Sequence, residues 1–173
     1  MKTRRAVILA FLVAAGILLQ LLESFVPVVM LVPGYKIGLA NIAGLFALYA
    51  YGTRDMVIVT VCRIFLAGLL TGTLFSVGFL LSISGAILAL SAMALARKSG
   101  LFSIYGVSVA GAAAHSVGQV LAVTAIYQQY FMQMFLPVLL ALSIVSGLLI
   151  ALVTERLLIR MRHVIGRSQP GRN

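Results

Sequence analysis

One charged residue, Arg63, stands out in a chain that is otherwise strongly apolar. It lies within the apolar stretch from Met56 to Leu70, where a guanidinium in hydrocarbon costs several kcal/mol unless it has a partner. Few groups can neutralise it, because the chain has three acidic residues, Glu23, Asp55 and Glu155. Arg63 is therefore a candidate functional residue. A second interpretation stays open, in which Arg63 pairs with Glu23 as a structural clamp.

Further polar residues are expected at a similar depth in the membrane. His115 is near the middle of its apolar segment, and Gln119 follows one helical turn later on the same face. Asn41 lies about one turn inward from the outer end of another segment, and Glu23 and Lys36 bracket the linker before it. These positions predict a substrate-binding cavity open to the outside. Its candidate residues are Arg63, His115, Gln119, Asn41, Lys36 and Glu23.

The residue types in this predicted cavity indicate the kind of ligand it would hold. The cationic candidates favour a carboxylate or phosphate, and the surrounding Phe, Leu and Met residues favour an apolar body. Each candidate also has a simpler interpretation. The two amide side chains and Glu23 can hydrogen-bond between helices or cap helix ends, and His115 can be an ordinary core residue.

Several kinds of catalytic chemistry have no sequence support. The chain has no G-x-x-x-x-G-K-[ST] phosphate-binding loop, so it cannot hydrolyse ATP by that route. Its three carboxylates lie far apart, whereas a magnesium–diphosphate site needs clustered acids. The two histidines, His115 and His163, are also widely separated, which argues against a zinc site. We therefore expect no metal, no cofactor and no enzymatic activity.

The composition indicates a multi-pass membrane protein, and its expected location is a bacterial inner or plasma membrane. Apolar residues make up 62% of the 173 residues and charged residues 9%, with a mean hydropathy of +1.16. The net charge of +10 comes mostly from short basic clusters beside apolar runs. Because no aromatic residues are interleaved with these clusters, we interpret the charge as a topology signal and expect no nucleic-acid partner.

The elements that must position the candidate residues are six apolar segments, which predict an all-α, six-helix membrane protein. A helix needs about 20 residues to cross the hydrocarbon, so the second and third segments are short. Residues 1–173 are expected to form one integral membrane domain with a basic tail over 159–173. The predicted helices cover 6–22, 37–51, 56–70, 73–96, 102–127 and 135–158.

The distribution of basic residues predicts that both termini are cytoplasmic. Lysine and arginine gather at the N-terminus, after the second and fourth segments, and in the tail. Lys36 is the exception on the opposite side, and Arg63 lies within the membrane. By the positive-inside rule, the basic side faces the cytoplasm.

Two further segments have alternative interpretations. The apolar linker between Glu23 and Lys36 is broken by prolines, so it predicts either an interfacial loop or a lid over the cavity. Small residues recur every fourth position on the first segment, and a similar stripe occurs on the fifth. Such stripes allow close helix packing within the chain, or on the first helix a docking face for another membrane subunit. The first stripe is Ala6, Ala10 and Ala14.

Several of these motifs together resemble one family. They are LLESFVP (21–27), PGYKIGLANIAGLFALYAYGTRD (33–55), Arg63, and VSVAGAAAHSVGQ (107–119). They resemble the Gx transporter family, also labelled heptaprenyl diphosphate synthase component I, over nearly the whole chain up to about residue 150. That family is similar to the substrate-binding S components of energy-coupling factor (ECF) transporters.

The resemblance implies six helices with both ends inside and a ligand bound from the outer face. It also implies that the alanine stripe of the first helix docks onto an ECF transmembrane T component, which works with two ATPase subunits. The expected function is uptake of a small vitamin-like, anionic or amphipathic ligand, and the family label suggests an isoprenoid or quinone precursor. The alternative is a non-catalytic membrane accessory of a prenyl diphosphate synthase or of quinone biosynthesis.

Overall fold

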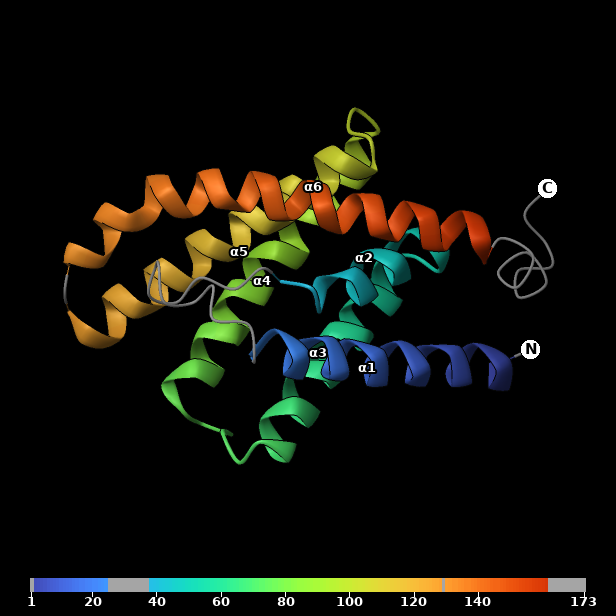
Figure 1. Cartoon of the computed structure of the whole chain (residues 1–173), viewed down its shortest axis with the longest axis horizontal. Helices are drawn as coiled ribbons and strands as arrows, with labels where there is room; N and C mark the ends of the chain where they lie inside the picture. Colours follow the sequence, from blue (N-terminus) through green and yellow to red (C-terminus); the bar gives the residue numbers. More distant parts are fainter. Residues whose placement is uncertain (1, 25–37, 129, 162–173) are drawn as a thin grey trace.

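The computed structural model describes residues 2–24, 38–128 and 130–161, and this part of the chain is helical without strands. It forms six α-helices and one short 3-10 helix (Figure 1). This architecture confirms the all-α, six-helix prediction. The elements are α1 (Lys2–Ser24), α2 (Asn41–Ala50), α3 (Thr53–Leu70), α4 (Val77–Ser99), α5 (Ile104–Tyr127), η2 (Tyr130–Phe135) and α6 (Leu136–Arg160).

Several helices have the length and apolarity to cross a membrane, so the chain is a membrane protein. Four described stretches meet both conditions: Thr3–Glu23, Val77–Ser99, Ile104–Tyr127 and Gln133–Arg160. Helix α2 has ten residues, about 15 Å, and does not cross the hydrocarbon by itself. Helix α3 has 18 residues but carries Arg54, Asp55 and Arg63.

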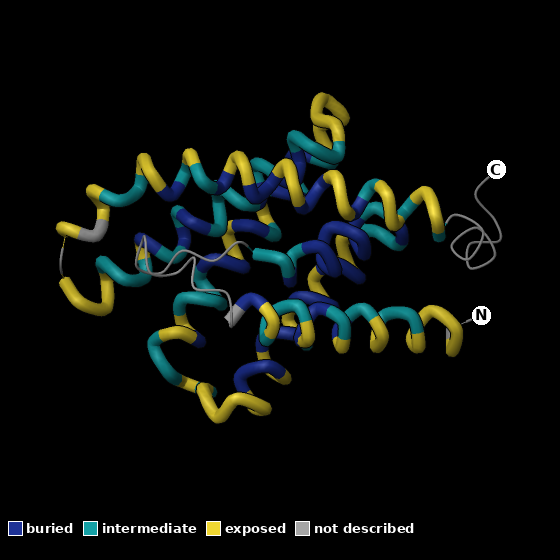
Figure 2. Tube along the Cα trace, in the orientation of Figure 1, coloured by how far each residue is buried: buried dark blue, intermediate teal, exposed yellow. Residues whose placement is uncertain are grey.

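The short helix α2 forms the centre of the molecule. Eight of its ten residues are buried, and Leu45, Phe46, Ala47 and Leu48 are 2% exposed or less. Figure 2 shows this helix almost wholly buried between longer helices whose outward faces are exposed. An apolar helix buried all round by protein needs no contact with lipid. Its lack of length is therefore compatible with a position inside the bundle.

Small residues set the close contacts among α4, α5 and α6. A Cβ added to Gly118 of α5 would lie 2.7 Å from the Ser84 carbonyl oxygen of α4, so no larger residue fits there without movement. Gly147 of α6 approaches the backbone of Val109 in the same way, at 2.8 Å. The Ser108 hydroxyl then donates to the Gly147 carbonyl oxygen at 2.7 Å. These contacts are typical of helices that associate in lipid by packing.

The helix boundaries correct two predictions. The fourth helix begins at Val77 rather than at residue 73, because Gly72 and Phe75 both have positive φ and the Ser76 side chain caps the helix by accepting from the Phe79 N–H. The second helix begins at Asn41 rather than residue 37. Among the other helices, α1, α3 and α6 extend two to four residues beyond one or both predicted ends, whereas α5 begins two residues later and α6 one residue later than predicted.

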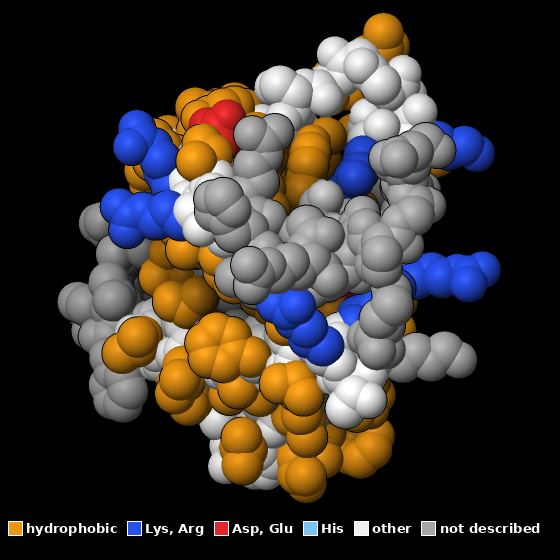
Figure 3. Space-filling view, turned by 90° about the vertical axis from the view of Figure 1, so that its right-hand side faces the viewer, with side chains coloured by type: hydrophobic (Ala, Val, Ile, Leu, Met, Phe, Trp, Pro, Cys, Tyr) orange, Lys and Arg blue, Asp and Glu red, His pale blue; other side chains and the backbone are white. Residues whose placement is uncertain are grey.

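The first and last helices bring both ends of the described chain together. Helices α1 and α6 run along the long axis, and the start of α1 and the end of α6 lie at the same end of the molecule (Figure 1). Figure 3 looks onto this end and shows several Lys and Arg side chains there. The exposed basic residues at the helix ends include Arg4, Arg5, Arg54, Lys98, Arg156 and Arg160.

Candidate functional site

The structure brings five of the six candidate residues to the wall of one cavity. The cavity has a volume of about 50 Å³ and lies between α1, α2, α3, α4, α5 and α6. Residues far apart in the sequence therefore meet at one cavity, in agreement with the similar membrane depth predicted for them. The five are Glu23, Asn41, Arg63, His115 and Gln119. The sixth candidate, Lys36, lies outside the described residues, as does most of the predicted lid.

Arg63 is buried and held by neutral amide side chains. It is 7% exposed. Its Nη1 donates to Gln20 Oε1 at 2.9 Å, and its Nη2 lies 3.5 Å from Asn41 Oδ1. The aliphatic part of the side chain passes directly over Gly16, where an added Cβ would lie 2.8 Å from Arg63 Cδ. Gly16 thus provides the space for the guanidinium to reach the cavity from α3.

Glu23 is also buried, but its carboxylate is occupied by backbone donors. Its Oε1 accepts from the Gly38 N–H at 2.7 Å and its Oε2 from the Leu39 N–H at 3.2 Å. These groups precede the N-terminus of α2, whose helix dipole also favours a negative charge. Glu23 therefore ties the end of α1 to the start of α2.

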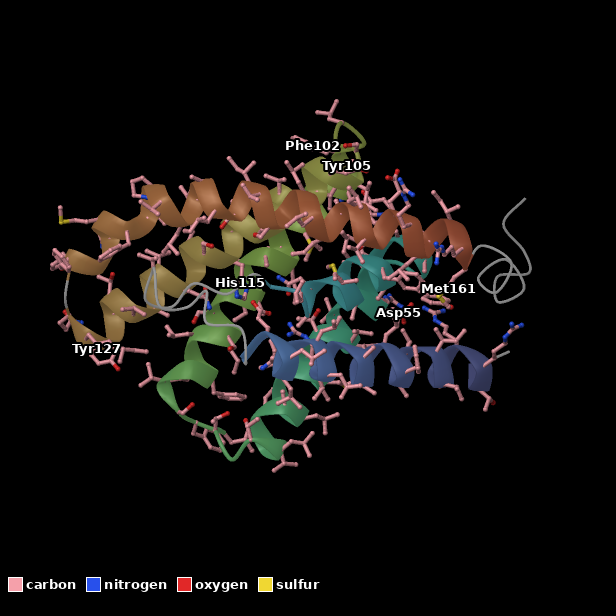
Figure 4. The ribbon with its side chains drawn as sticks, in the orientation of Figure 1. Asp55, Phe102, Tyr105, His115, Tyr127 and Met161 are labelled. Atoms are coloured by element: carbon pink, nitrogen blue, oxygen red, sulfur yellow. The ribbon has the colours of Figure 1, made fainter. Side chains whose placement is uncertain are left out.

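The predicted clamp between Arg63 and Glu23 is not formed as a direct ion pair. Among the described residues, the carboxylate that forms an ion pair is that of Asp55 on α3, and its partner is Arg5 on α1. Figure 4 shows Asp55 toward the end of the molecule where the termini lie and His115 in its central part. The ion pair and the cavity are thus at different levels of the bundle, and the hydrogen-bond acceptors of Arg63 are neutral amides.

Helices α4, α5 and α6 form the opposite wall of the cavity. The His115 ring packs against Gly85 of α4, where an added Cβ would lie 2.7 Å from the ring. On the next helix face, the hydroxyls of Ser116 and Ser143 are 2.7 Å apart and join α5 to α6. This wall contributes imidazole, amide and hydroxyl groups, and within the described cavity lining no acid other than Glu23 approaches Arg63.

Sequence reasoning missed several polar residues of the cavity. Gln20, which accepts the shorter Arg63 hydrogen bond, is a lone amide in an apolar helix, and its position one turn before Glu23 was a usable signal. The cavity serines gave no such signal, because a serine in a membrane helix commonly bonds to its own backbone. Ser143 does so, donating to the Leu139 carbonyl oxygen at 2.7 Å. The serines are Ser82, Ser116, Ser143 and Ser146.

The arrangement can bind a small anionic group. A buried guanidinium with two neutral acceptors retains further N–H donors for a carboxylate or phosphate. Among the residues that the structure describes, no group of His, Cys, Asp and Glu is placed to hold a metal ion. The cavity volume of about 50 Å³ matches a small polar group, since whole ligand pockets are commonly about 300–1,000 Å³.

The two stripes of small residues have different surroundings. On α5, Gly118 is buried, and Ala110 and Ala114 are partly buried within the bundle. On α1, Ala6, Ala10 and Ala14 are all exposed, beside the exposed side chains of Val7, Phe11 and Leu18. The first stripe therefore does not serve packing within the described part of the chain, and it faces outward from α1.

Comparison with known proteins identifies the family. The sequence profile of heptaprenyl diphosphate synthase component I matches residues 12–157. This range includes parts of all six α-helices and the five described candidate residues. No curated protein and no solved structure matches the chain. Since the match spans most of the sequence, the chain belongs to the heptaprenyl diphosphate synthase component I family.

Proposed function

We propose that this chain is the substrate-binding membrane subunit of an ECF-type transporter, which captures a small anionic or amphipathic molecule from outside the cell. The observation that carries the proposal is the buried Arg63 guanidinium on a cavity wall, bonded to the neutral side chains of Gln20 and Asn41. A buried charge without a direct counter-ion is costly, and an anionic ligand would relieve that cost.

In this proposal the energy for uptake comes from other subunits. The chain has no nucleotide-binding loop, so ATP hydrolysis is assigned to two separate ATPase subunits and membrane coupling to a T component. The exposed alanines of α1 supply a smooth helix face of the kind that packs closely against another helix in lipid. We assign Ala6, Ala10 and Ala14 to docking and assign no enzymatic activity to the chain itself.

The proposed orientation places both termini in the cytoplasm and the cavity toward the outside. The exposed basic residues at the end of the molecule shown in Figure 3 support this orientation through the positive-inside rule. Reporter domains fused to either terminus would be active only in the cytoplasm if the orientation is right. A periplasmic or extracellular signal from either fusion would reverse it.

A second function is favoured by the family name. Heptaprenyl diphosphate synthase component I suggests a membrane subunit that supports a separate prenyl diphosphate synthase or quinone biosynthesis. Such a role would be non-catalytic, because the single aspartate of the chain, Asp55, is paired with Arg5 away from the cavity. A magnesium–diphosphate site would need clustered acids instead.

Affinity purification of the tagged full chain from its own membranes separates the two functions. The transporter proposal expects a complex with a second membrane subunit and two ATPases, and uptake by the reconstituted complex that stops without ATP. Uptake by the isolated chain without ATP would reject it. Recovery of a soluble prenyltransferase in place of the ATPases would favour the accessory function.

A further inference from the structure

We propose that the ligand has two parts: an anionic group that binds beside Arg63 and an uncharged body that fills a second, larger cavity. This second cavity has a volume of about 290 Å³ and lies between the end of α1, the end of α3, the α3–α4 loop and the start of α4. The inference rests on the proposed binding function and specifies the chemical class of the ligand and a further part of its site.

The two cavities adjoin each other. Gln20, Ile64 and Ser82 line both of them. Gln20 is also the residue that accepts the 2.9 Å hydrogen bond from Arg63. A molecule whose anionic group contacts the guanidinium can therefore extend past Gln20 into the second cavity without crossing a helix.

The lining of the second cavity is unsuited to a second charge. None of its described lining residues is ionisable. Two of its four hydroxyl residues use their protons locally: Thr71 Oγ1 donates to the Ala67 carbonyl oxygen at 2.8 Å, and Ser82 Oγ donates to the Gly78 carbonyl oxygen at 2.9 Å. These two hydroxyls offer oxygen lone pairs to a ligand, and Thr71 adds a methyl group, whereas an anion needs donors.

An aromatic wall suits a largely apolar body. Phe79 lines the second cavity, is buried, and is fixed by edge-to-face contacts with Phe65 at 5.4 Å and Phe75 at 6.0 Å between ring centroids. Gly68 permits this position, because an added Cβ would lie 3.1 Å from the Phe79 ring. The wall is therefore preorganised, which reduces the entropy lost on binding.

The volumes give the relative sizes of the two parts. The cavity at Arg63 holds about 50 Å³ and its neighbour about 290 Å³, so most of the ligand would lie in the uncharged cavity. This division favours a small water-soluble amphipath with one anionic end. A phospholipid with two long acyl chains is too large for the combined space.

The test compares pairs of anions that differ only in their apolar body, titrated against the purified full chain. The pairs are inorganic phosphate with butyl phosphate, and acetate with hexanoate. Each buried methylene strengthens binding about fourfold, so we expect the longer member of at least one pair to bind at least about tenfold more tightly to the wild type. Phosphatidic acid, added to the detergent micelles that hold the purified chain, is the lipid control.

Gly78→Leu is the informative variant, because an added Cβ at Gly78 has only the Ser76 hydroxyl within 4 Å, at 3.8 Å, and the side chain would fill the second cavity. It should remove the preference for the longer anion and leave the affinity of the shorter one unchanged. The exposed Ile87→Phe, outside the lining of both cavities, is the control, and it should bind like the wild type.

The outcomes distinguish this inference from the proposed function. If short anions bind and the longer anions bind no more tightly, the two-part ligand alone is overturned. The same holds if the longer anions keep their higher affinity in Gly78→Leu. Displacement of butyl phosphate by phosphatidic acid would also overturn it. Failure of every anion to bind the folded wild type would overturn the proposed function as well.

Discussion

Glu23 illustrates how a buried carboxylate can be structural while lying on a ligand cavity. Both of its oxygens accept backbone N–H groups just before α2, and losing a hydrogen bond to a buried charged group costs about 1.5–3 kcal/mol. We therefore expect Glu23→Ala to lower the free energy of unfolding by about 2–4 kcal/mol. Glu23→Gln should cost about half as much because it keeps one acceptor. Unfolding in mild detergent measures both, and an unchanged stability of Glu23→Ala would contradict this assignment.

Gly16 is predicted to control the position of Arg63. Any Cβ at this position meets Arg63 Cδ at 2.8 Å, so Gly16→Val should push the guanidinium from its place beside Gln20. We expect the affinity for inorganic phosphate or acetate, measured by titration calorimetry, to fall about tenfold, equivalent to one charge-assisted hydrogen bond. Ala14→Val, on the exposed face of the same helix, is the matched control. Equal affinities of the two variants would show that Gly16 has no such role.

At the residue scale, much of the cavity was predictable because depth depends only on the rise per residue along a helix. This rule was enough to group Arg63, His115, Gln119 and Asn41. It did not reveal which partner each side chain has. The pairing of Arg63 with Gln20, rather than with Glu23, depends on the rotation and tilt of α1, which the sequence pattern leaves undetermined.

At the scale of helices, glycine contacts decide how closely α4 and α5 approach. Gly118→Ala would place a Cβ within 2.7 Å of a backbone oxygen and 2.9 Å of the Gly85 Cα, neither of which can move independently of its helix. We expect a loss of about 1–3 kcal/mol in unfolding free energy, as is typical of overpacking. Gly78→Ala, where an added Cβ meets no close neighbour, should be neutral or stabilising by about 0.5–1 kcal/mol. Similar stabilities for the two variants would contradict the packing argument.

The number and type of helices followed from apolar length and basic turns, but helix boundaries did not. The predicted break before the fourth helix covered only residues 71–72. Apolar side chains resume at Leu74, so hydropathy gave no sign that the loop continues to residue 76. That loop depends on the positive φ of Gly72 and Phe75 and on the Ser76 cap. Likewise, the central burial of α2 depends on the surrounding helices covering it, which no local pattern encodes.

At the scale of the whole molecule, α1 connects the proposed docking face with the cavity. One side of this helix exposes Ala6, Ala10 and Ala14, and another carries Gln20 and Glu23 to the cavity. Replacing Ala10 by Leu should leave the unfolding free energy within about 0.5 kcal/mol of wild type, because the site is exposed. Under the transporter proposal, it should sharply reduce recovery of the T component and ATPases with the tagged chain. Undiminished recovery would exclude this helix face as the docking surface.

The central claim is that Arg63 binds an anionic molecule in the cavity that it lines, and native mass spectrometry of the gently purified full chain tests it most directly. The account predicts that the wild type retains a small acidic molecule and that Arg63→Gln, confirmed as folded by its unfolding transition, does not. Arg63→Lys should retain it weakly, because lysine keeps the charge but loses the planar pair of donors. Retention of the same molecule by wild type and Arg63→Gln, or a wild type that binds no anion at all, would contradict it.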